Sequence, residues 1–572
     1  MEASTRDWSG WFRRRLAGLL VFGFIALGTI RIIATYPVFN HTVDEVAHIA
    51  CGMEWLDRGA YTIEDQLTGQ TDYNSNPPLA RAMGALGPYL SGIGMQGVWD
   101  RQQDVYGLYG EGRAILYAGD HYQRTLALSH LGILPFFWIG CLAVYFWARK
   151  YFGKPTGVVA VFLFSFVPSV LAHASVSTTD MALTAFMGAV FVAMLLWCEH
   201  PTGGRSVLFG IMGALAILSK FSSLAFFPPA ALAVFAAYLA AARPGARQVF
   251  GSIKHLLLPA ALALGVAALV VWTGYRFHFG AVSFAGIQLP APEFFNGIHS
   301  VWMHNQSGHP SYLLGMHSEF GWWYFFPVVL GVKTPIPFLL LFFYGAWESV
   351  RRWKEKAGAF LFPLGFSLAI LGVGMAGNIN VGVRHILPVY VGFSITAAVG
   401  VLRLYELGRT AAWTKWVLWL CMGWMAFTSL AAHPDYLPYF NFLARDEPET
   451  VPGVHGPEKI LADSDLDWGQ DMRRLAARLK EKGIDHFTMM PLIFDDYVKD
   501  GLPRMYRGNP NRPNPGWNAV SITMWLNMRM RASHPWPDNP DAQPVEHVGK
   551  GILLYYFPEG PGEASNPPAA SP

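Results

Sequence analysis

The amino-acid sequence predicts an all-α polytopic membrane protein that ends in a small α/β domain. Its composition is the first reason: 52% of the residues are hydrophobic and 14% are charged, whereas roughly a quarter of an ordinary soluble domain is charged. A series of apolar runs has the length that a helix needs to cross a bilayer. After Pro434 the composition changes and no such run occurs. The net charge of +3 is small and spread between the runs, so no nucleic-acid partner is expected.

About eleven apolar runs are candidate transmembrane helices, because about 20 residues cross the hydrocarbon core. The fifth run is short, and a polar interruption at Lys220 separates it from the sixth. Three arginines precede the first run, but no small-residue cleavage site follows it, so we expect a retained anchor. The runs occupy residues 16–35, 126–148, 156–174, 181–198, 206–219, 222–242, 256–274, 325–346, 359–377, 386–402 and 412–431.

The basic residues predict how these helices are oriented. Short cytoplasmic loops carry an excess of Lys and Arg, and basic residues gather after every even-numbered run. The N-terminus is therefore expected in the cytoplasm. The long loops 36–125 and 275–324 and everything after residue 431 are expected on the extracytoplasmic side. Functional residues are often carried by such loops.

The chain divides into three expected parts. Residues 1–433 form the transmembrane domain, 434–557 an extracytoplasmic α/β domain, and 558–572 a tail that is rich in Pro, Gly, Ala and Ser and is expected to be disordered. Within the second part, strands are expected at 459–462, 486–490, 520–524 and 551–557. A helix is expected at 470–482, so the first strands and this helix form a βαβ unit.

Acidic residues directly follow the first apolar run. Thr42 and Glu45 have the spacing of a capping box, which favours a structural role for Glu45. Asp44 has no such explanation. Asp44 and His48 are four residues apart and share a helical face, so they could form an acid–base pair or contribute to a metal site. Two residues are too few to define that metal site.

A second carboxylate, Asp180, lies in a turn on the same predicted side of the membrane. It could be a charge favoured by a helix N-terminus, or it could act together with Asp44 on a hydroxyl group or an ion. Four basic or imidazole side chains beside the apolar spans are candidates to hold a phosphate, with interfacial anchoring as the alternative. They are Lys220, Lys333, Arg384 and His385.

Other residue patterns do not predict a metal centre. The alternating acidic residues of 463–467 resemble a calcium loop, but Gly469 and Arg474 stand at the wrong positions for an EF-hand. A strand end and a helix cap explain this segment. Three of the four cysteines lie within apolar runs, and the histidines of loop 275–324 lack ligand spacing. No metal ligand is assigned, and a divalent metal stays an open alternative.

Several segments together resemble glycosyltransferase family 39, a group of polyprenyl-phosphate-dependent enzymes that includes protein O-mannosyltransferases and lipid A aminoarabinose transferases. The tail segment 463–470, which ends in Asp-Trp-Gly-Gln, is similar to that of bacterial phospholipid carrier-dependent glycosyltransferases. The resembling segments are Asp44-Glu45, residues 76–79, 180–184, 219–221, 311–315, 321–327, 332–335, 384–388 and 463–470.

This resemblance implies the GT-C fold and an inverting transfer of a sugar from a polyprenyl-phosphate donor to an acceptor hydroxyl on the extracytoplasmic face of a bacterial-type inner or plasma membrane. It implies that Asp44 is the catalytic carboxylate and Asp180 the second acidic position, with Glu45 beside them. Asn76, His48 and Tyr312 are expected in the sugar or acceptor pocket. Aminoarabinose transferases carry a Lys where Asn76 stands here, which shifts the expected phosphate contact to Lys220, Lys333 or Arg384.

Two other functions stay open at this point. The chain could be a non-enzymatic carrier or flippase for such lipids, although it lacks the paired, interrupted halves of many transporters. It could also be an accessory subunit of an envelope complex. The expected partners are a polyprenyl-phosphate-linked sugar, a protein, lipid or glycan acceptor, and membrane lipids. The C-terminal domain is expected to cover the external cavity and shape acceptor access.

Overall fold

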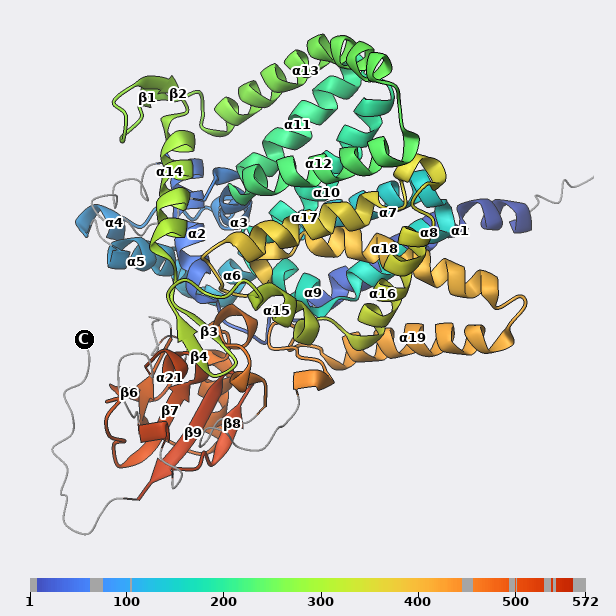
Figure 1. Ribbon diagram of the computed structural model, residues 1–572. Helices are drawn as coiled ribbons and strands as arrows, with labels where there is room; N and C mark the ends of the chain where they lie inside the picture. The colour runs from blue at the N-terminus through green and yellow to red at the C-terminus, as the bar shows by residue number, and fades with distance from the viewer. Residues whose placement is uncertain are drawn as a thin grey trace, which may run out of the picture.

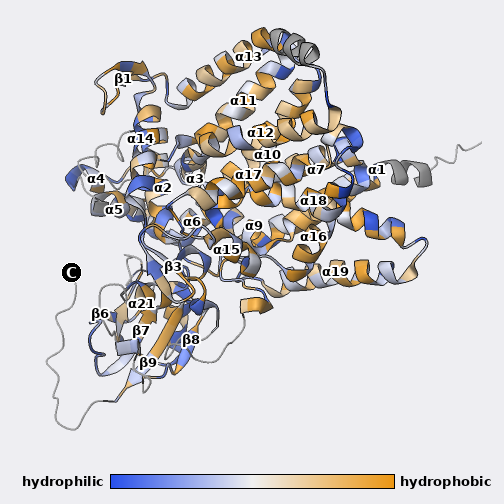
Figure 2. Ribbon diagram, in the orientation of Figure 1, coloured by the Kyte–Doolittle hydropathy of each residue, from blue (hydrophilic) through white to orange (hydrophobic). Residues whose placement is uncertain are grey.

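The computed structural model describes residues 8–61, 76–102, 105–444, 456–492, 499, 501–528, 536–538 and 542–558. Long helices form the body of the molecule, and a small sheet region adjoins one end of it (Figure 1). Hydrophobic residues dominate the long helices (Figure 2).

The helices follow one another along almost the whole chain. They are α1 (Trp8–Ile33), α2 (Val43–Asp57), α3 (Pro78–Leu90), α4 (Val98–Arg101), α5 (Val105–Leu116), α6 (Tyr122–Leu131), α7 (Leu134–Phe152), α8 (Lys154–Ser165), α9 (Pro168–Ala174), α10 (Asp180–Glu199), α11 (Gly203–Ser219), α12 (Ser222–Ala242), α13 (Ala246–Gly274), α14 (Pro292–Ser307), α15 (Phe325–Lys333), α16 (Ile336–Arg351), α17 (Phe362–Ala376), α18 (Val389–Leu407), α19 (Ala412–Ala431), α20 (Met472–Glu481) and α21 (Ile522–Met528).

Within the described residues, seven helical stretches are long and apolar enough to cross a membrane. Two bent pairs raise the number to nine if each is one span: α8 with α9, bent by 69°, and α15 with α16, bent by 118°. The polytopic membrane architecture is therefore confirmed, but about eleven spans is more than these criteria give. All eleven predicted runs are helical. The shortfall comes from α11, which has 17 residues, and from α19, whose several tryptophans and Lys415 reduce its apolar character.

The most buried spans form the centre of the helical body. In α10, 78% of the apolar stretch that could cross the membrane is buried inside the protein, whereas only 11% of such a stretch in α13 is buried. Helix α10 packs on α7 and α11, and α18 packs on α8, α16 and α17. Aromatic rings fill the centre: Trp147 stacks on Phe191 at 5.7 Å between ring centroids, and Phe366 contacts both edge-on.

The C-terminal region contains a five-stranded mixed sheet of order β6-β5-β7-β9-β8. Strand β5 is parallel to β6 and β7, whereas β9 is antiparallel to both β7 and β8. Two hairpins in the second long loop, β1 with β2 and β3 with β4, are separate from this sheet. The strands are β1 (Phe279–Ala281), β2 (Gln288–Pro290), β3 (Ser311–Leu313), β4 (Met316–Ser318), β5 (His486–Met490), β6 (Arg504–Arg507), β7 (Gly516–Ser521), β8 (Glu546–Val548) and β9 (Ile552–Phe557).

The secondary structure of this region was predicted in part. The helix at 470–482 and the strands at 486–490 and 551–557 are confirmed as α20, β5 and β9. The strand at 459–462 is wrong, and with it the βαβ unit, because Leu461 is buried in the core of the helical body instead of the sheet. The strand at 520–524 is half right, since β7 ends at Ser521 and α21 begins at Ile522. The predicted disordered tail lies outside the described residues, apart from Pro558.

The buried carboxylate of Asp467 produces that boundary. It accepts hydrogen bonds from the Ser521 hydroxyl and from the backbone N–H groups of Thr523 and Gly469, the last two at 3.2 and 3.0 Å. Its side chain is buried, and burial raises the pKa of Asp467 to about 6. Asp467 therefore holds the start of α21 to the segment that precedes α20.

We expect Asp467→Ala to lower the thermal midpoint of the purified protein in detergent micelles. The substitution leaves three donors without an acceptor, and each buried unsatisfied group costs about 1–3 kcal/mol. Asp485→Ala is the control, because the side chain of Asp485 is 90% exposed in the same region. Equal midpoints for the two variants would contradict the role assigned to Asp467.

Candidate active site

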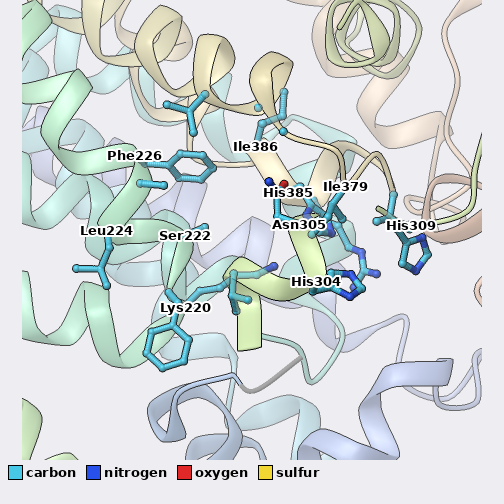
Figure 3. A pocket seen from close by; sticks show the side chains of 18 of the residues that line it. Lys220, Ser222, Leu224, Phe226, His304, Asn305, His309, Ile379, His385 and Ile386 are labelled. Carbon is cyan, nitrogen blue, oxygen red and sulfur yellow. The ribbon is translucent and has the colours of Figure 1, made fainter. Parts of the chain in front are cut away.

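A cavity of about 640 Å³ lies where the first long loop, the second long loop and the ends of several spans meet. Its polar end is lined by Asp44, Lys220, Arg384, His385 and Asn76. Its other walls come from α12, α14 and α17 and combine apolar side chains with Ser222, His304 and Asn305 (Figure 3). The cavity is therefore amphiphilic, and it unites five of the residues predicted from sequence.

Asp44 is the second residue of α2, and its position depends on the start of that helix. The Asp44 carboxylate accepts a hydrogen bond from Arg384 Nη1 at 2.8 Å. Burial raises the pKa of Asp44, but the charge of Arg384, its hydrogen bond and a contribution from His48 together hold that pKa below its ordinary value. The side chain keeps 31% of its surface exposed and lines the cavity. Asp44 is therefore an ionised group that a bound molecule can reach.

Glu45 is fully buried, and both of its oxygens are used. One oxygen accepts hydrogen bonds from the N–H of Thr42 at 2.6 Å and from its hydroxyl at 3.0 Å; the other contacts the Ser177 N–H and His130 Nε2, both at 2.6 Å. The capping box predicted from sequence is confirmed. These contacts hold the pKa of Glu45 at about 2 despite its burial. Glu45 thus fixes the start of α2 against α6 and the turn before α10.

The second carboxylate, Asp180, begins α10 and forms an ion pair with Lys220 at 2.6 Å. Its other oxygen accepts a hydrogen bond from the Thr178 hydroxyl at 3.3 Å. Lys220 stands at the break between α11 and α12, where its extended backbone ends α11. Its side chain lines the cavity (Figure 3). The polar interruption in the apolar run thus delivers a cation to the cavity, with Asp180 behind it.

Arg384 and His385 reach the cavity from the 3₁₀ turn Val383–Ile386. Besides its bond to Asp44, the Arg384 guanidinium lies over the ring of Trp468, 4.2 Å from the centroid. Its Nε is buried without a hydrogen-bond partner. Burial and the charges of Lys220 and Arg384 hold the pKa of His385 well below its ordinary value, so the imidazole is neutral at neutral pH.

Five predicted site residues do not line the cavity: Glu45 and Asp180, described above, and three others. Lys333 is buried elsewhere and donates to the carbonyl oxygens of Leu437 and Asp465, both at 2.6 Å. Tyr312 lies in β3 and is part of the core of the C-terminal region. His48 is buried behind Asp44 and accepts a hydrogen bond from Arg81 Nε at 3.0 Å.

The environment of His48 disfavours the metal alternative. Burial and the charge of Arg81 lower the pKa of His48 to about 3, so it is neutral, but Arg81 already occupies its Nδ1. Across the described part of the chain, no group of three or more His, Cys, Asp or Glu side chains is arranged to hold a metal ion.

The structure also brings residues to the site that sequence analysis did not select. His304, Asn305 and His309 line the cavity from α14 and the residues after it (Figure 3). His309 Nδ1 lies 2.9 Å from the carbonyl of Pro310, and a carbonyl only accepts, so this nitrogen carries the proton. The histidines of this loop lack metal-ligand spacing, and no local signal in the sequence links these residues to Asp44.

Comparison with known proteins agrees with the motif resemblance. Residues 134–282 match the family model described as dolichyl-phosphate-mannose-protein mannosyltransferase. No curated protein matches the sequence. Among solved structures, the fold is similar to ArnT from Cupriavidus metallidurans bound to undecaprenyl phosphate, with 14% identity, a TM-score of 0.49, and coverage of 97% of this chain and 100% of that chain.

It is also similar to the archaeal oligosaccharyltransferase AglB from Archaeoglobus fulgidus in complex with an inhibitory peptide and a dolichol-phosphate. The identity is 12%, the TM-score is 0.46, and the match covers 90% of this chain and 70% of that chain. The resemblance to the polyprenyl-phosphate-dependent glycosyltransferases is confirmed by the family model, over residues 134–282 of the chain.

Proposed function

We propose that this protein is a membrane glycosyltransferase that moves a sugar from a polyprenyl-phosphate donor to an acceptor hydroxyl. The observation that carries the proposal is the ion pair of Asp44 and Arg384 at the polar end of an amphiphilic cavity. The motif resemblance and the family-model match over residues 134–282 support the same reaction class.

The cavity fits the two parts of such a donor. Arg384 and Lys220 are two cations at its polar end, and Arg in particular binds phosphate oxygens with several parallel hydrogen bonds. Arg384 has five N–H donors, so it can contact a phosphate while it stays bound to Asp44. The apolar walls, among them Leu224, Phe226 and Val373, suit the first prenyl units.

Asp44 is the proposed general base. As the acceptor oxygen bonds to the anomeric carbon, its proton passes to the Asp44 carboxylate. The bond between the anomeric carbon and the phosphate oxygen breaks on the opposite face, so the configuration inverts. Polyprenyl phosphate leaves with the electron pair, and Arg384 and Lys220 stabilise the charge that develops on it.

The remaining residues have supporting roles in this proposal. Asp180 orients Lys220, while neutral His385 and Asn76 line the cavity within reach of a bound sugar. Glu45 fixes α2 and takes no part in proton transfer, because its oxygens are already used. Lys333 has no phosphate-binding role in this proposal, since its ammonium group donates to two carbonyl groups outside the cavity.

We further propose that the site and the C-terminal region lie on the extracytoplasmic side. The Val43 N–H, just after α1, donates to the Trp468 carbonyl at 3.1 Å. Arg31, near the end of α1, donates to the Ser429 hydroxyl near the end of α19 at 2.9 Å. If α1 crosses the bilayer from a cytoplasmic N-terminus, these contacts put both regions on the far side, whatever the total number of spans.

A reporter fused after Leu430 tests this orientation. Alkaline phosphatase at this position is expected to be active, because it folds only after export, and a cytoplasmic fluorescent protein there is expected to stay dark. The reverse result would contradict the proposed location of the site.

We expect Asp44→Asn to lower sugar transfer about 10²–10⁴-fold, because the amide keeps the size of the carboxylate but cannot take the proton. The product is first identified by mass spectrometry of glycans and lipids from cells with and without the protein, and its amount is then compared between variants. Asp100→Asn is the matched control, because Asp100 also pairs with an arginine, Arg58, but on the surface. Normal transfer by Asp44→Asn would contradict the assignment of Asp44 as the general base.

Donor binding gives a separate prediction. Arg384→Ala and Lys220→Ala should each weaken the affinity of the purified protein in nanodiscs for undecaprenyl phosphate about 10-fold to 150-fold, because a hydrogen bond to a charged group is worth about 1.5–3 kcal/mol. Arg58→Ala removes the arginine of the surface pair and should leave the affinity unchanged. If the three variants bind alike, the proposed phosphate site is wrong.

A further inference from the structure

Trp468 contacts both of the segments that carry the Asp44–Arg384 ion pair. Its ring lies under the Arg384 guanidinium, with 4.2 Å between the centroid and the guanidinium carbon. Its carbonyl oxygen accepts the N–H of Val43, the residue before Asp44, at 3.1 Å. Trp468 is 2% exposed. One buried residue of the C-terminal region therefore contacts the two segments from which the ion pair is built.

The residues around Trp468 hold the chain just ahead of Asp44. Asn40 donates its backbone N–H to the Gln470 carbonyl at 3.3 Å and its side-chain amide to the Gly469 carbonyl at 2.7 Å. In return, the Met472 N–H donates to the side-chain oxygen of Asn40 at 2.8 Å. Together with the bond from Val43, these contacts fix the entry into α2 on the C-terminal region.

The preceding residues hold the turn that carries Arg384. Both oxygens of Asp465 lie 3.2 Å from the Val383 N–H, and the Ser464 hydroxyl donates to the Val381 carbonyl. Gly382 allows this approach: its φ is +113°, and a Cβ there would lie 2.8 Å from Ser464 Oγ. The turn 381–384 is thus pressed against Asp465 and Ser464.

The segment Asp463–Gln470 is itself anchored on two sides. Asp467 binds Ser521 and Thr523 of the sheet region. The carbonyl of Asp465 accepts from Lys333 of α15 at 2.6 Å. Contacts with both the sheet region and α15 make the segment a support for the site, in contrast to a loose cover over the cavity.

We propose that Trp468 is a positioning residue that sets the Arg384 guanidinium against Asp44 and towards the phosphate of the donor. This inference rests on the proposed function and extends it, because the transfer site then depends on the C-terminal region. The aromatic face supports the guanidinium plane by a cation–π contact, while the backbone carbonyl fixes the start of α2. Trp468 itself touches neither the sugar nor the acceptor in this proposal.

The ion pair gives this role a measurable signature in the pH dependence of transfer. The charged and titratable groups that act on Asp44 are Arg384 from the turn, His48 from α2, Asp180 from α10 and Asp463 from the C-terminal segment. Arg384 lowers the pKa of Asp44. A guanidinium that moves away from Asp44 lets that pKa rise, so the fall in kcat/KM on the acid side begins at a higher pH.

The test compares Trp468→Leu, Trp468→Phe and Trp525→Leu in the full-length protein in nanodiscs. We expect Trp468→Leu to weaken undecaprenyl phosphate binding about 2-fold to 30-fold and to shift the acid limb of the pH profile upward. Trp468→Phe keeps an aromatic face, so its affinity for undecaprenyl phosphate and its acid limb should both lie close to those of the unsubstituted protein. Trp525 is fully buried in the core of the same region, so Trp525→Leu should lower thermal stability and leave the acid limb unchanged.

A second measurement does not depend on turnover. The Arg384 side chain is 12% exposed, and its modification by phenylglyoxal, followed by peptide mass spectrometry, reports how firmly it is held. Modification should be several-fold faster in Trp468→Leu than in Trp525→Leu. Equal modification rates and an unchanged acid limb would overturn the positioning role, whereas full transfer by Asp44→Asn would overturn the general-base role of Asp44 on which the proposed function rests.

Discussion

The ion pair between Asp44 and Arg384 joins side chains that are 340 residues apart in the chain. Removing two charges from water costs several kcal/mol for each ion, and their attraction offsets this cost only with good geometry and further hydrogen bonds. The surroundings provide that geometry through the Glu45 capping box, the Asp465 carboxylate on the Val383 N–H, and the Trp468 ring. Contacts from the helical body and from the C-terminal region therefore both support this one ion pair.

The other buried charges near the cavity follow the same rule. Lys220 is paired with Asp180, and Glu45 contacts His130 as well as two backbone N–H groups. Compensation is complete for Glu45 and incomplete for Arg384, whose Nε has no hydrogen-bond partner. An N–H group of Arg384 that has no partner in the protein is able to donate a hydrogen bond to a phosphate oxygen. The difference between a saturated carboxylate and an unsaturated guanidinium separates Glu45, which holds the start of α2, from Arg384, which we propose as a phosphate ligand.

Local signals in the sequence were sufficient for the helical character of the apolar runs, the capping box at Thr42 and Glu45, and strand β5. They failed wherever a distant contact decided the structure. Ile460 and Leu461 have the apolar character of a strand, but Leu461 packs with the helical core. The end of β7 depends on Asp467, 54 residues before Ser521. Lys333 and Lys220 looked alike as isolated cations beside apolar runs. Only the packing of the chain decides that one binds carbonyl groups and the other reaches the cavity.

The order of the chain has a consequence for how the cavity is assembled. Asp44 lies at the start of the second helix, α2, and Arg384 lies just before α18. The segment that holds both of them follows the last long helix, α19. During synthesis, the helical body can therefore be inserted before residues 463–472 exist, but Asn40 and Val43 then lack the partners that fix the start of α2. The ion pair gains its full support only when the C-terminal region docks, so a partly made chain holds the cavity walls without the geometry proposed for transfer.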